Sequence, residues 1–127
     1  MKAQYSVPLA MLAGIGVGAV AVQTLHAQAK PPVYYISEIE VTDIDGYTKE
    51  YAPKVQGTVK AAGGRLLAAG QKVTALEGNA PKRAVVQVWD SVEKIQAWRT
   101  SAEYLENRKI GDKYAKFRAY AIEGLPQ

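Results

Sequence analysis

The order of strand-like and helix-like segments beyond residue 32 constrains the fold of this chain more than any other feature. The stretch VYYISEIEV (33–41) is rich in β-branched and aromatic residues, which predicts a strand. Asp43 or Asp45 is placed to cap a helix whose apolar residues recur at spacings of three or four up to about residue 62. Pro53 predicts a kink or a restart within that helix, because proline is tolerated best in a first turn.

Three glycines lie beside Arg65 in AAGGRLLAAG (61–70), a stretch that could be mistaken for a phosphate-binding loop. Such a loop follows a strand, opens a helix and shows G-x-G-x-x-G or G-x-x-x-x-G-K-[ST]. Here Gly63-Gly64 follow the predicted helix and precede a predicted strand, RLLAAG (65–70), and neither pattern is present. We therefore interpret the glycines as a helix C-cap and a hairpin turn.

The rest of the chain continues the alternation of strands and helices. RAVVQVW (83–89) has the strongest strand pattern, and Asp90 or Ser91 is placed to cap a second helix. The remaining predicted segments are a short hairpin strand KVTALEG (72–78), a helical stretch capped by Ser101 and ended by Gly111, and a last strand FRAYAIEG (117–124).

With the short hairpin strand 72–78 set aside, the order β-α-β-β-α-β predicts an α+β fold of the ferredoxin-like class. In it a four-stranded antiparallel sheet carries both helices on one face. The other face of the sheet needs a cover, and so short a domain supplies little core of its own. We therefore expect a homodimer in which two sheets pack face to face as a dimeric α/β barrel.

The first 29 residues have the pattern of a secretory signal peptide. A basic start at Lys2 precedes an apolar run (7–22), and small residues permit cleavage after Ala27 or Ala29. The sequence thus predicts a signal peptide (1–29), a linker KPP (30–32), a domain (33–124) and a short tail (125–127), in a periplasmic or secreted protein. The alternative is an uncleaved run that anchors the protein in the inner membrane.

Removal of that leader would exclude several classes of chemistry. His26 is the only histidine and the chain has no cysteine, so a Ser-His-Asp triad, a thiolate nucleophile and a Cys/His zinc site are not expected. No metal or cofactor is predicted, because no D-x-D-x-D-G spacing occurs either. The net charge of +4 comes without a dense run of lysine or arginine, so nucleic acid is not an expected partner.

Several motifs in order resemble the bacterial family called domain of unknown function 1330. They are YYISEIEVTD, AAGGRLLAAG, ALEG, AWRTSAEY and AIEG, over roughly residues 33–124. The resemblance implies a dimeric α/β barrel related in fold to antibiotic-biosynthesis monooxygenases, and it implies no established activity. Ala62 stands where relatives often have a histidine before the double glycine, so a general base there does not carry over.

Strand alternation assigns side chains to the two faces of the sheet. The residues predicted to face the helices are Tyr35, Ile39, Val41, Ala84, Val86, Val88, Phe117, Ala119 and Ala121. The residues predicted to face the cleft between two sheets are Tyr34, Ile36, Glu38, Arg83, Val85, Gln87, Trp89, Arg118, Tyr120 and Ile122.

Three functional hypotheses follow from the cleft. The first is a homodimer that binds a small apolar or aromatic acid there through Tyr34, Arg65, Gln87, Trp89 and Tyr120. The second is a cofactor-independent oxygenase or isomerase with Glu38 as base and Arg118 or Arg65 stabilising an oxyanion. The third is a structural protein in which Glu38 and Arg118 form only a cross-strand pair.

Overall fold

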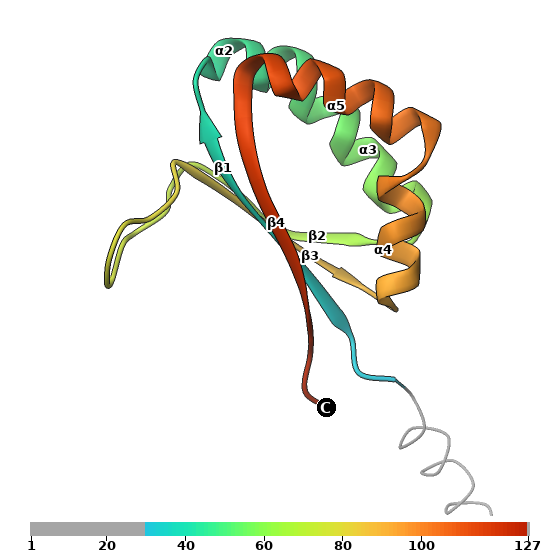
Figure 1. Ribbon diagram of the computed structural model, residues 1–127. Helices are drawn as coiled ribbons and strands as arrows, with labels where there is room; N and C mark the ends of the chain where they lie inside the picture. The colour runs from blue at the N-terminus through green and yellow to red at the C-terminus, as the bar shows by residue number, and fades with distance from the viewer. Residues whose placement is uncertain (1–29, 127) are drawn as a thin grey trace, which may run out of the picture. The chain divides into compact units, whose positions relative to one another are not determined.

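The computed structural model describes residues 30–126, and the predicted signal peptide lies outside them. Four strands, β1 (Val33–Val41), β2 (Arg65–Gly70), β3 (Arg83–Trp89) and β4 (Ala115–Glu123), form one antiparallel sheet in the order β2-β3-β1-β4. The helices lie on one face of this sheet, as Figure 1 shows. This confirms the ferredoxin-like α+β prediction.

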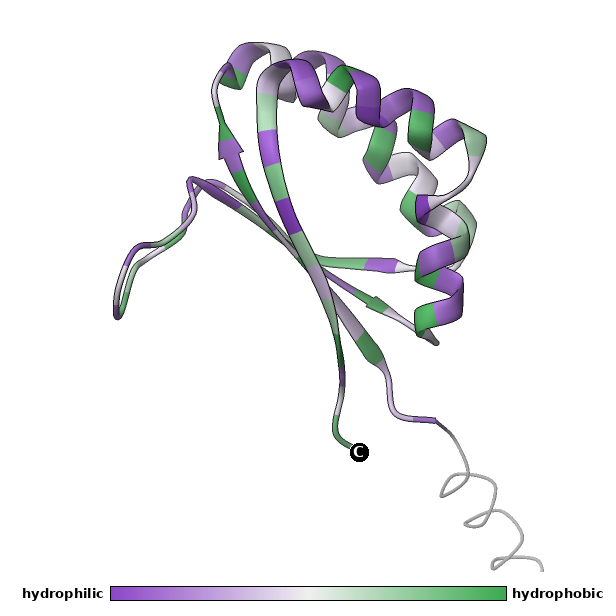
Figure 2. Ribbon diagram, in the orientation of Figure 1, coloured by the Kyte–Doolittle hydropathy of each residue, from purple (hydrophilic) through white to green (hydrophobic). Residues whose placement is uncertain are grey.

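The helical layer consists of two stretches, the second of which is interrupted at Thr100 and Ser101. The first joins α2 (Ile44–Gly46), a π-helical turn η1 (Tyr47–Tyr51) and α3 (Ala52–Ala62), and the second joins α4 (Val92–Arg99) and α5 (Ala102–Tyr114). Their buried side chains, among them Tyr47, Val59 and Trp98, pack in the core, and hydrophobic and hydrophilic residues alternate along the helical ribbons (Figure 2). No helix among the described residues is long and apolar enough to cross a membrane.

The irregularity predicted at Pro53 takes the form of the π-helical turn η1, which ends two residues before the proline. Pro53 lies in the first turn of α3, where its missing N–H does no harm, and the wider turn before it absorbs the interrupted hydrogen bonding. Tyr47 and Tyr51 thereby lie on the same side, with ring centroids 5.3 Å apart, and both are buried.

Helix ends follow the predicted capping residues. Asp43, Ser91 and Ser101 each accept a hydrogen bond from the backbone N–H three residues later. Gly63 ends α3 with φ of 105°, and a side chain at Gly64 would meet the ring of Trp89 at 2.5 Å. The C-cap interpretation of the double glycine is confirmed.

Two predicted boundaries were wrong. Residues 72–78 are not a strand; residues 71–82 form an irregular arm that leaves the sheet between β2 and β3, yellow to green in Figure 1. Gly111 does not end α5, which continues to Tyr114. A Cβ at Gly111 would lie 2.7 Å from the ring of Tyr51, so glycine serves close packing of α5 on η1 there.

The predicted facing is right on β1 and β4 and inverted on β3. Residues directly opposite each other in an antiparallel pair share a face, and Tyr35 pairs with Gln87 and Val33 with Trp89. Gln87 and Trp89 are therefore buried under the helices. Arg83 and Val85 follow them, which leaves Ala84, Val86 and Val88 on the bare face.

Candidate functional site

On the bare face of the sheet, three predicted residues meet, which we call the sheet-face cluster (Glu38, Arg118 and Tyr120). Glu38 lies opposite Arg118 in the pairing of β1 with β4. Arg118 Nη2 donates to Glu38 Oε2 at 3.1 Å, and the Tyr120 hydroxyl donates to the same oxygen at 2.9 Å. Strand order and alternation brought these three together as predicted.

The electrostatics of the sheet-face cluster favour a stable carboxylate over a base. The hydrogen bond from Arg118, followed by that from Tyr120, lowers the pKa of Glu38 below its ordinary value. A carboxylate whose charge is already satisfied accepts a proton from a substrate poorly. The arrangement suits a cross-strand ion pair better than a general base.

The remaining predicted site residues do not join this cluster. Tyr34 lies on the same face but opposite Val88 and Ile122, four residues along β1 from Glu38. Arg65 lies two strands away on the edge strand β2 and is exposed. Gln87 and Trp89 occupy the other face, where Trp89 Nε1 donates to Gln87 Oε1 at 2.8 Å.

Between the sheet and the helices lies an inner cavity of about 40 Å³ that sequence reasoning missed. Its volume is enough for a few water molecules. Aromatic and aliphatic side chains line most of it, and seven of the lining residues also carry a hydroxyl or amide group. These residues are Tyr35, Ser37, Tyr47, Tyr51, Gln56, Gln87 and Tyr104.

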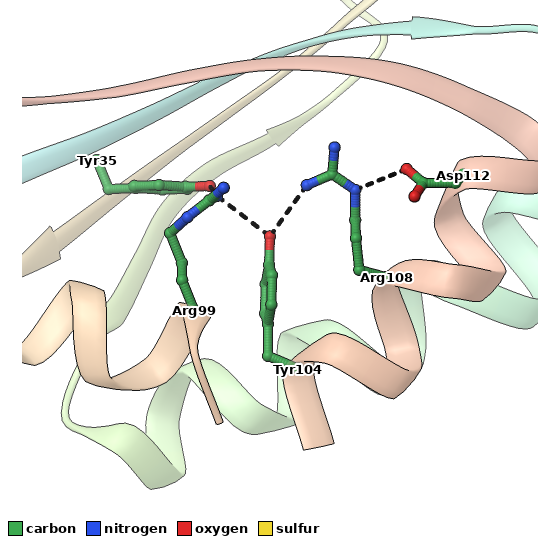
Figure 3. A network of polar contacts seen from close by, with 5 residues as sticks. All are labelled: Tyr35, Arg99, Tyr104, Arg108 and Asp112. Carbon is green, nitrogen blue, oxygen red and sulfur yellow. Dashed lines mark hydrogen bonds and ion pairs between the residues drawn. The ribbon is translucent and has the colours of Figure 1, made fainter. Parts of the chain in front are cut away.

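Two arginines support the tyrosine hydroxyls beside this cavity, as Figure 3 shows. Arg99 Nη1 donates to the Tyr35 hydroxyl at 2.5 Å and to the Tyr104 hydroxyl at 3.2 Å. Arg108 Nη1 donates to the Tyr104 hydroxyl at 3.4 Å, while its Nε donates to Asp112 at 2.9 Å. Two guanidinium charges thus face one carboxylate, and the network carries a net positive charge.

Three tyrosines of the inner cavity, Tyr35, Tyr47 and Tyr51, keep their protons at neutral pH. Burial raises the pKa of Tyr35 to about 12, and burial also raises the pKa values of Tyr47 and Tyr51. Since arginine only donates, the Tyr35 and Tyr104 oxygens accept from Arg99 and retain a proton to donate. Hydroxyl donors supported by guanidinium groups suit a ligand oxygen that carries negative charge.

The sequence contains a signal for the residues of the inner cavity, but that signal is ambiguous. Tyr47 and Tyr51 lie at helical spacing, which is also the spacing of an ordinary core, and Arg108 has the position of a solvated helix residue. The available signal was that Tyr47 and Tyr51 recur on one face of the predicted helix, while Tyr35 is predicted to face the helices from the first strand. A core built from apolar residues alone would not place four hydroxyls in one layer.

The fold and the cavity define a ferredoxin-like α+β domain with an aromatic pocket under its helices. The chain belongs to the family described as domain of unknown function (DUF1330), whose model matches residues 32–125. None of the curated protein sequences matches this chain.

Solved structures show the same fold at low sequence identity. A protein of unknown function from Rhodopseudomonas palustris is 14% identical with a TM-score of 0.64, over 84% of this chain and 94% of that one. SnoaB, a cofactor-independent oxygenase from Streptomyces nogalater, is 8% identical with a TM-score of 0.58, over 76% and 96%. A putative antibiotic biosynthesis monooxygenase from Nitrosomonas europaea is 14% identical with a TM-score of 0.51, over 76% and 92%.

Proposed function

We propose that this protein binds a small aromatic or apolar organic acid in the inner cavity, with the acid group held by the hydroxyls of Tyr35 and Tyr104. The observation that carries the proposal is the convergence of Arg99 and Arg108 on the Tyr104 hydroxyl, 3.2 and 3.4 Å from it. Two positive charges with one carboxylate partner, beside an apolar aromatic wall, complement an anion with a flat apolar body.

The ligand class is the one expected from the sequence, but its place is different. The sequence led us to expect it in the cleft between two sheets, whereas the enclosed space with matching donors lies under the helices. Gln87, assigned to the ligand from the sequence, keeps that role in this proposal because it lines the inner cavity.

Entry to the inner cavity would take place between α3 and β2. Gln56 and Leu66 line the cavity and are both exposed to solvent, so they form its rim. The strand pairing shifts register between Leu66 and Ala68, and such bulges often redirect side chains next to binding sites. A ligand larger than a few water molecules requires these rim side chains to move aside.

Binding is favoured over catalysis by what lines the cavity. No aspartate, glutamate or histidine is among the lining residues of the described chain, so the cavity offers donors for an oxyanion but no ready base. Glu38, the base in the enzymatic hypothesis, faces the opposite side of the sheet. An oxygenase or isomerase acting here would need a substrate acidic enough to arrive as its anion.

The bare face of the sheet supports the second part of the proposal, a homodimer. Tyr120 and Ile122 there are 43% and 57% exposed. Val86 and Val88, which are partly exposed, lie on the other side of β1, with Ile36 and Tyr34 between the two pairs. A second copy would cover this apolar surface. The sheet-face cluster would then supply polar contacts within the interface.

The experiment uses benzoate as probe and benzamide as its uncharged match, with tryptophan fluorescence and thermal unfolding as readouts. Benzoate should change the fluorescence of Trp98, which lines the cavity, and should raise the melting temperature while benzamide does not. Tyr104→Phe and Arg99→Gln should each weaken this response at least tenfold.

The matched control is Arg118→Gln on the bare face of the sheet. It should leave benzoate binding unchanged if the ligand occupies the inner cavity. A loss of binding in Arg118→Gln with normal binding in Tyr104→Phe would instead return the ligand to the cleft between sheets and refute the cavity.

A further inference from the structure

Two polar side chains on the sheet side of the inner cavity have hydrogen-bonding groups without a partner. Ser37 on β1 and Gln87 on β3 line the cavity and are only 6% and 4% exposed. Among the described residues the Ser37 hydroxyl makes no hydrogen bond, and the Gln87 side chain makes one, through its amide oxygen. Buried polar groups in native proteins are almost always hydrogen-bonded, so these two require partners that the described chain does not supply.

The unpaired groups of Ser37 and Gln87 open into the cavity. Of the side-chain polar atoms in the described chain that are sealed from water-sized space, only Arg83 Nε lacks a hydrogen bond. The Ser37 hydroxyl and the Gln87 amide nitrogen are unpaired but not sealed, and the space that reaches them is the cavity that both residues line.

The indole of Trp89 fixes which way the Gln87 amide points. Trp89 Nε1 donates to Gln87 Oε1 at 2.8 Å in a buried hydrogen bond, and an indole nitrogen pairs only with an acceptor. Trp89 does not line the cavity, whereas Val85, on the other side of Gln87 along β3, does. The amide oxygen therefore points to the edge of the cavity, and the amide NH₂ is left to donate into it.

Strand pairing places the Ser37 hydroxyl beside this amide. Ser37 lies opposite Val85, and Gln87 lies opposite Tyr35, so Ser37 and Gln87 are diagonal neighbours on one face of adjacent strands. Gln87 offers N–H donors there, and the Ser37 hydroxyl can either donate or accept. We call this pair the cavity floor (Ser37 and Gln87), and one ligand oxygen can bind to both of its members.

The cavity floor lies at the opposite side of the cavity from the proposed acid site. The Tyr35 side chain extends from the sheet to Arg99 on α4, which donates to its hydroxyl (Figure 3), and Tyr104 belongs to α5. An acid group held by those two hydroxyls therefore lies on the helix side. No charged residue of the described chain lines the cavity, so the floor suits a neutral oxygen better than a second carboxylate.

We propose that the ligand is an aromatic acid that carries a phenolic hydroxyl across the ring from its carboxylate, and that the cavity floor binds this hydroxyl. The inference rests on the proposed function, because the carboxylate keeps the place assigned to it there. The phenolic oxygen accepts from the Gln87 amide, and the phenol shares a hydrogen bond with the Ser37 hydroxyl. A methyl group in its place leaves both floor groups unpaired beside the ligand, which costs affinity.

The test compares 3- and 4-hydroxybenzoate with 3- and 4-methylbenzoate, which have nearly the same shape but carry a methyl group in place of the hydroxyl. Tryptophan fluorescence and thermal unfolding of the full chain give the dissociation constants. At least one hydroxylated acid should bind roughly tenfold more tightly than its methylated match. Equal affinities within both pairs would overturn this inference and leave the benzoate proposal standing, whereas failure of every acid to bind would overturn both.

Substitutions at the two ends of the cavity should act on different quantities. Ser37→Ala removes only a hydroxyl, so it should reduce the preference for the hydroxylated acid several-fold and leave the affinity for the methylated acid unchanged. Gln87→Leu should reduce that preference as well, and it should also lower the melting temperature because Trp89 Nε1 loses its acceptor. Tyr104→Phe is the matched control at the helix side, where it should weaken both acids equally and leave the preference intact.

The melting temperature without ligand separates a binding role of Ser37 from a structural one. Because its hydroxyl has no partner in the described chain, Ser37→Ala should melt at or slightly above the temperature of the unmodified chain. A lower melting temperature together with an unchanged preference would show that the hydroxyl serves the fold through a bound water. That result would overturn the assignment of the cavity floor.

Discussion

The two faces of the sheet differ in how completely the chain itself covers their apolar side chains and pairs their polar groups. Under the helices, Trp89, Tyr35 and Ile39 are each at most 5% exposed, and their polar atoms have partners within the fold. On the bare face, Ile122 is 57% exposed and the polar groups form one compact ion-pair cluster. The covered face owes its stability to packing within the domain, whereas the bare face leaves large apolar side chains exposed to solvent.

The largest expected effect comes from removing a large side chain on each face. Trp89→Ala should lower the free energy of unfolding by about 3–5 kcal/mol because it opens a cavity under the helices. Ile122→Ala should cost under about 0.5 kcal/mol in a monomer, because that side chain is more than half exposed. Urea unfolding of both variants measures the difference.

Protein concentration turns this comparison into a test of the homodimer. If a second copy covers the bare face, the cost of Ile122→Ala should rise at high concentration and fall on dilution, while the cost of Trp89→Ala stays constant. A small cost of Ile122→Ala at every concentration would argue against the dimer interface proposed for this face.

The next largest effect is a pH dependence that is strongest on the covered face. Burial raises the pKa of Tyr35 from 10.0 to about 12, so the folded state holds a proton that the unfolded state releases between these values. The resulting stabilisation is present below pH 10 and is lost as the pH rises toward 12, by up to about 3 kcal/mol. Tyr35→Phe should therefore lose less stability than the unmodified chain over that range.

Unfolding in urea at several alkaline pH values measures this difference. Tyr120→Phe is the comparison on the bare face: the hydrogen bond to Glu38 also raises the pKa of Tyr120, but because this hydroxyl is exposed to solvent its effect on stability should be smaller than that of Tyr35. Parallel curves for the unmodified chain and Tyr35→Phe between pH 10 and 12 would contradict the raised pKa of Tyr35.

A smaller effect tests how closely the helical layer packs above the covered face. Gly111→Ala places a Cβ 2.7 Å from the ring of Tyr51, which should cost about 2 kcal/mol because the ring must shift. Gly57→Ala is the control within α3, where a Cβ meets nothing within 4 Å. It should stabilise by about 0.5–1 kcal/mol, and thermal unfolding distinguishes the two signs.

The contrast between the faces also explains what could be predicted from the sequence. On β1, one alternating set holds Tyr35, Ile39 and Val41 and the other contains Glu38, so the buried face is readable. On β3 one alternating set is wholly apolar, whereas the other, which is the buried one, carries Arg83 and Gln87. Ala84, Val86 and Val88 looked like core because they carry no polar group, yet they belong to the bare face, whose apolar character suits a partner.

The sheet-face cluster and the inner cavity also differ in how far the sequence could predict them. The meeting of Glu38 with Arg118 follows from strand order and alternation, which are properties a sequence displays. The inner cavity depends on where side chains from β1, η1, α4 and α5 end, and on a π-helical turn that aligns Tyr47 with Tyr51. Arg83 illustrates the limit best: alternation predicted that it faces the cleft between two sheets, whereas the structure buries it under the helices against the ring of Tyr47.

The smallest expected effect belongs to the bare face and to Glu38. The hydrogen bonds from Arg118 and Tyr120 lower the pKa of Glu38, so the unfolded state binds a proton at a higher pH than the folded state. The stabilisation is therefore present at neutral pH and is lost as the pH falls below the ordinary range of a glutamate. Because the pair is exposed to solvent and salt, its contribution is small in a monomer.

Glu38→Gln should thus be slightly less stable than the unmodified chain at pH 7, and the two should converge near pH 3. Glu40→Gln, two residues along β1 and without a side-chain hydrogen bond or ion pair among the described residues, should show no such convergence. Urea unfolding at low and high salt sharpens the comparison between the faces, because salt screens an exposed pair and barely affects a covered one. A difference that survives high salt would mean that the sheet-face cluster is shielded from solvent, as it would be under a second copy of the sheet.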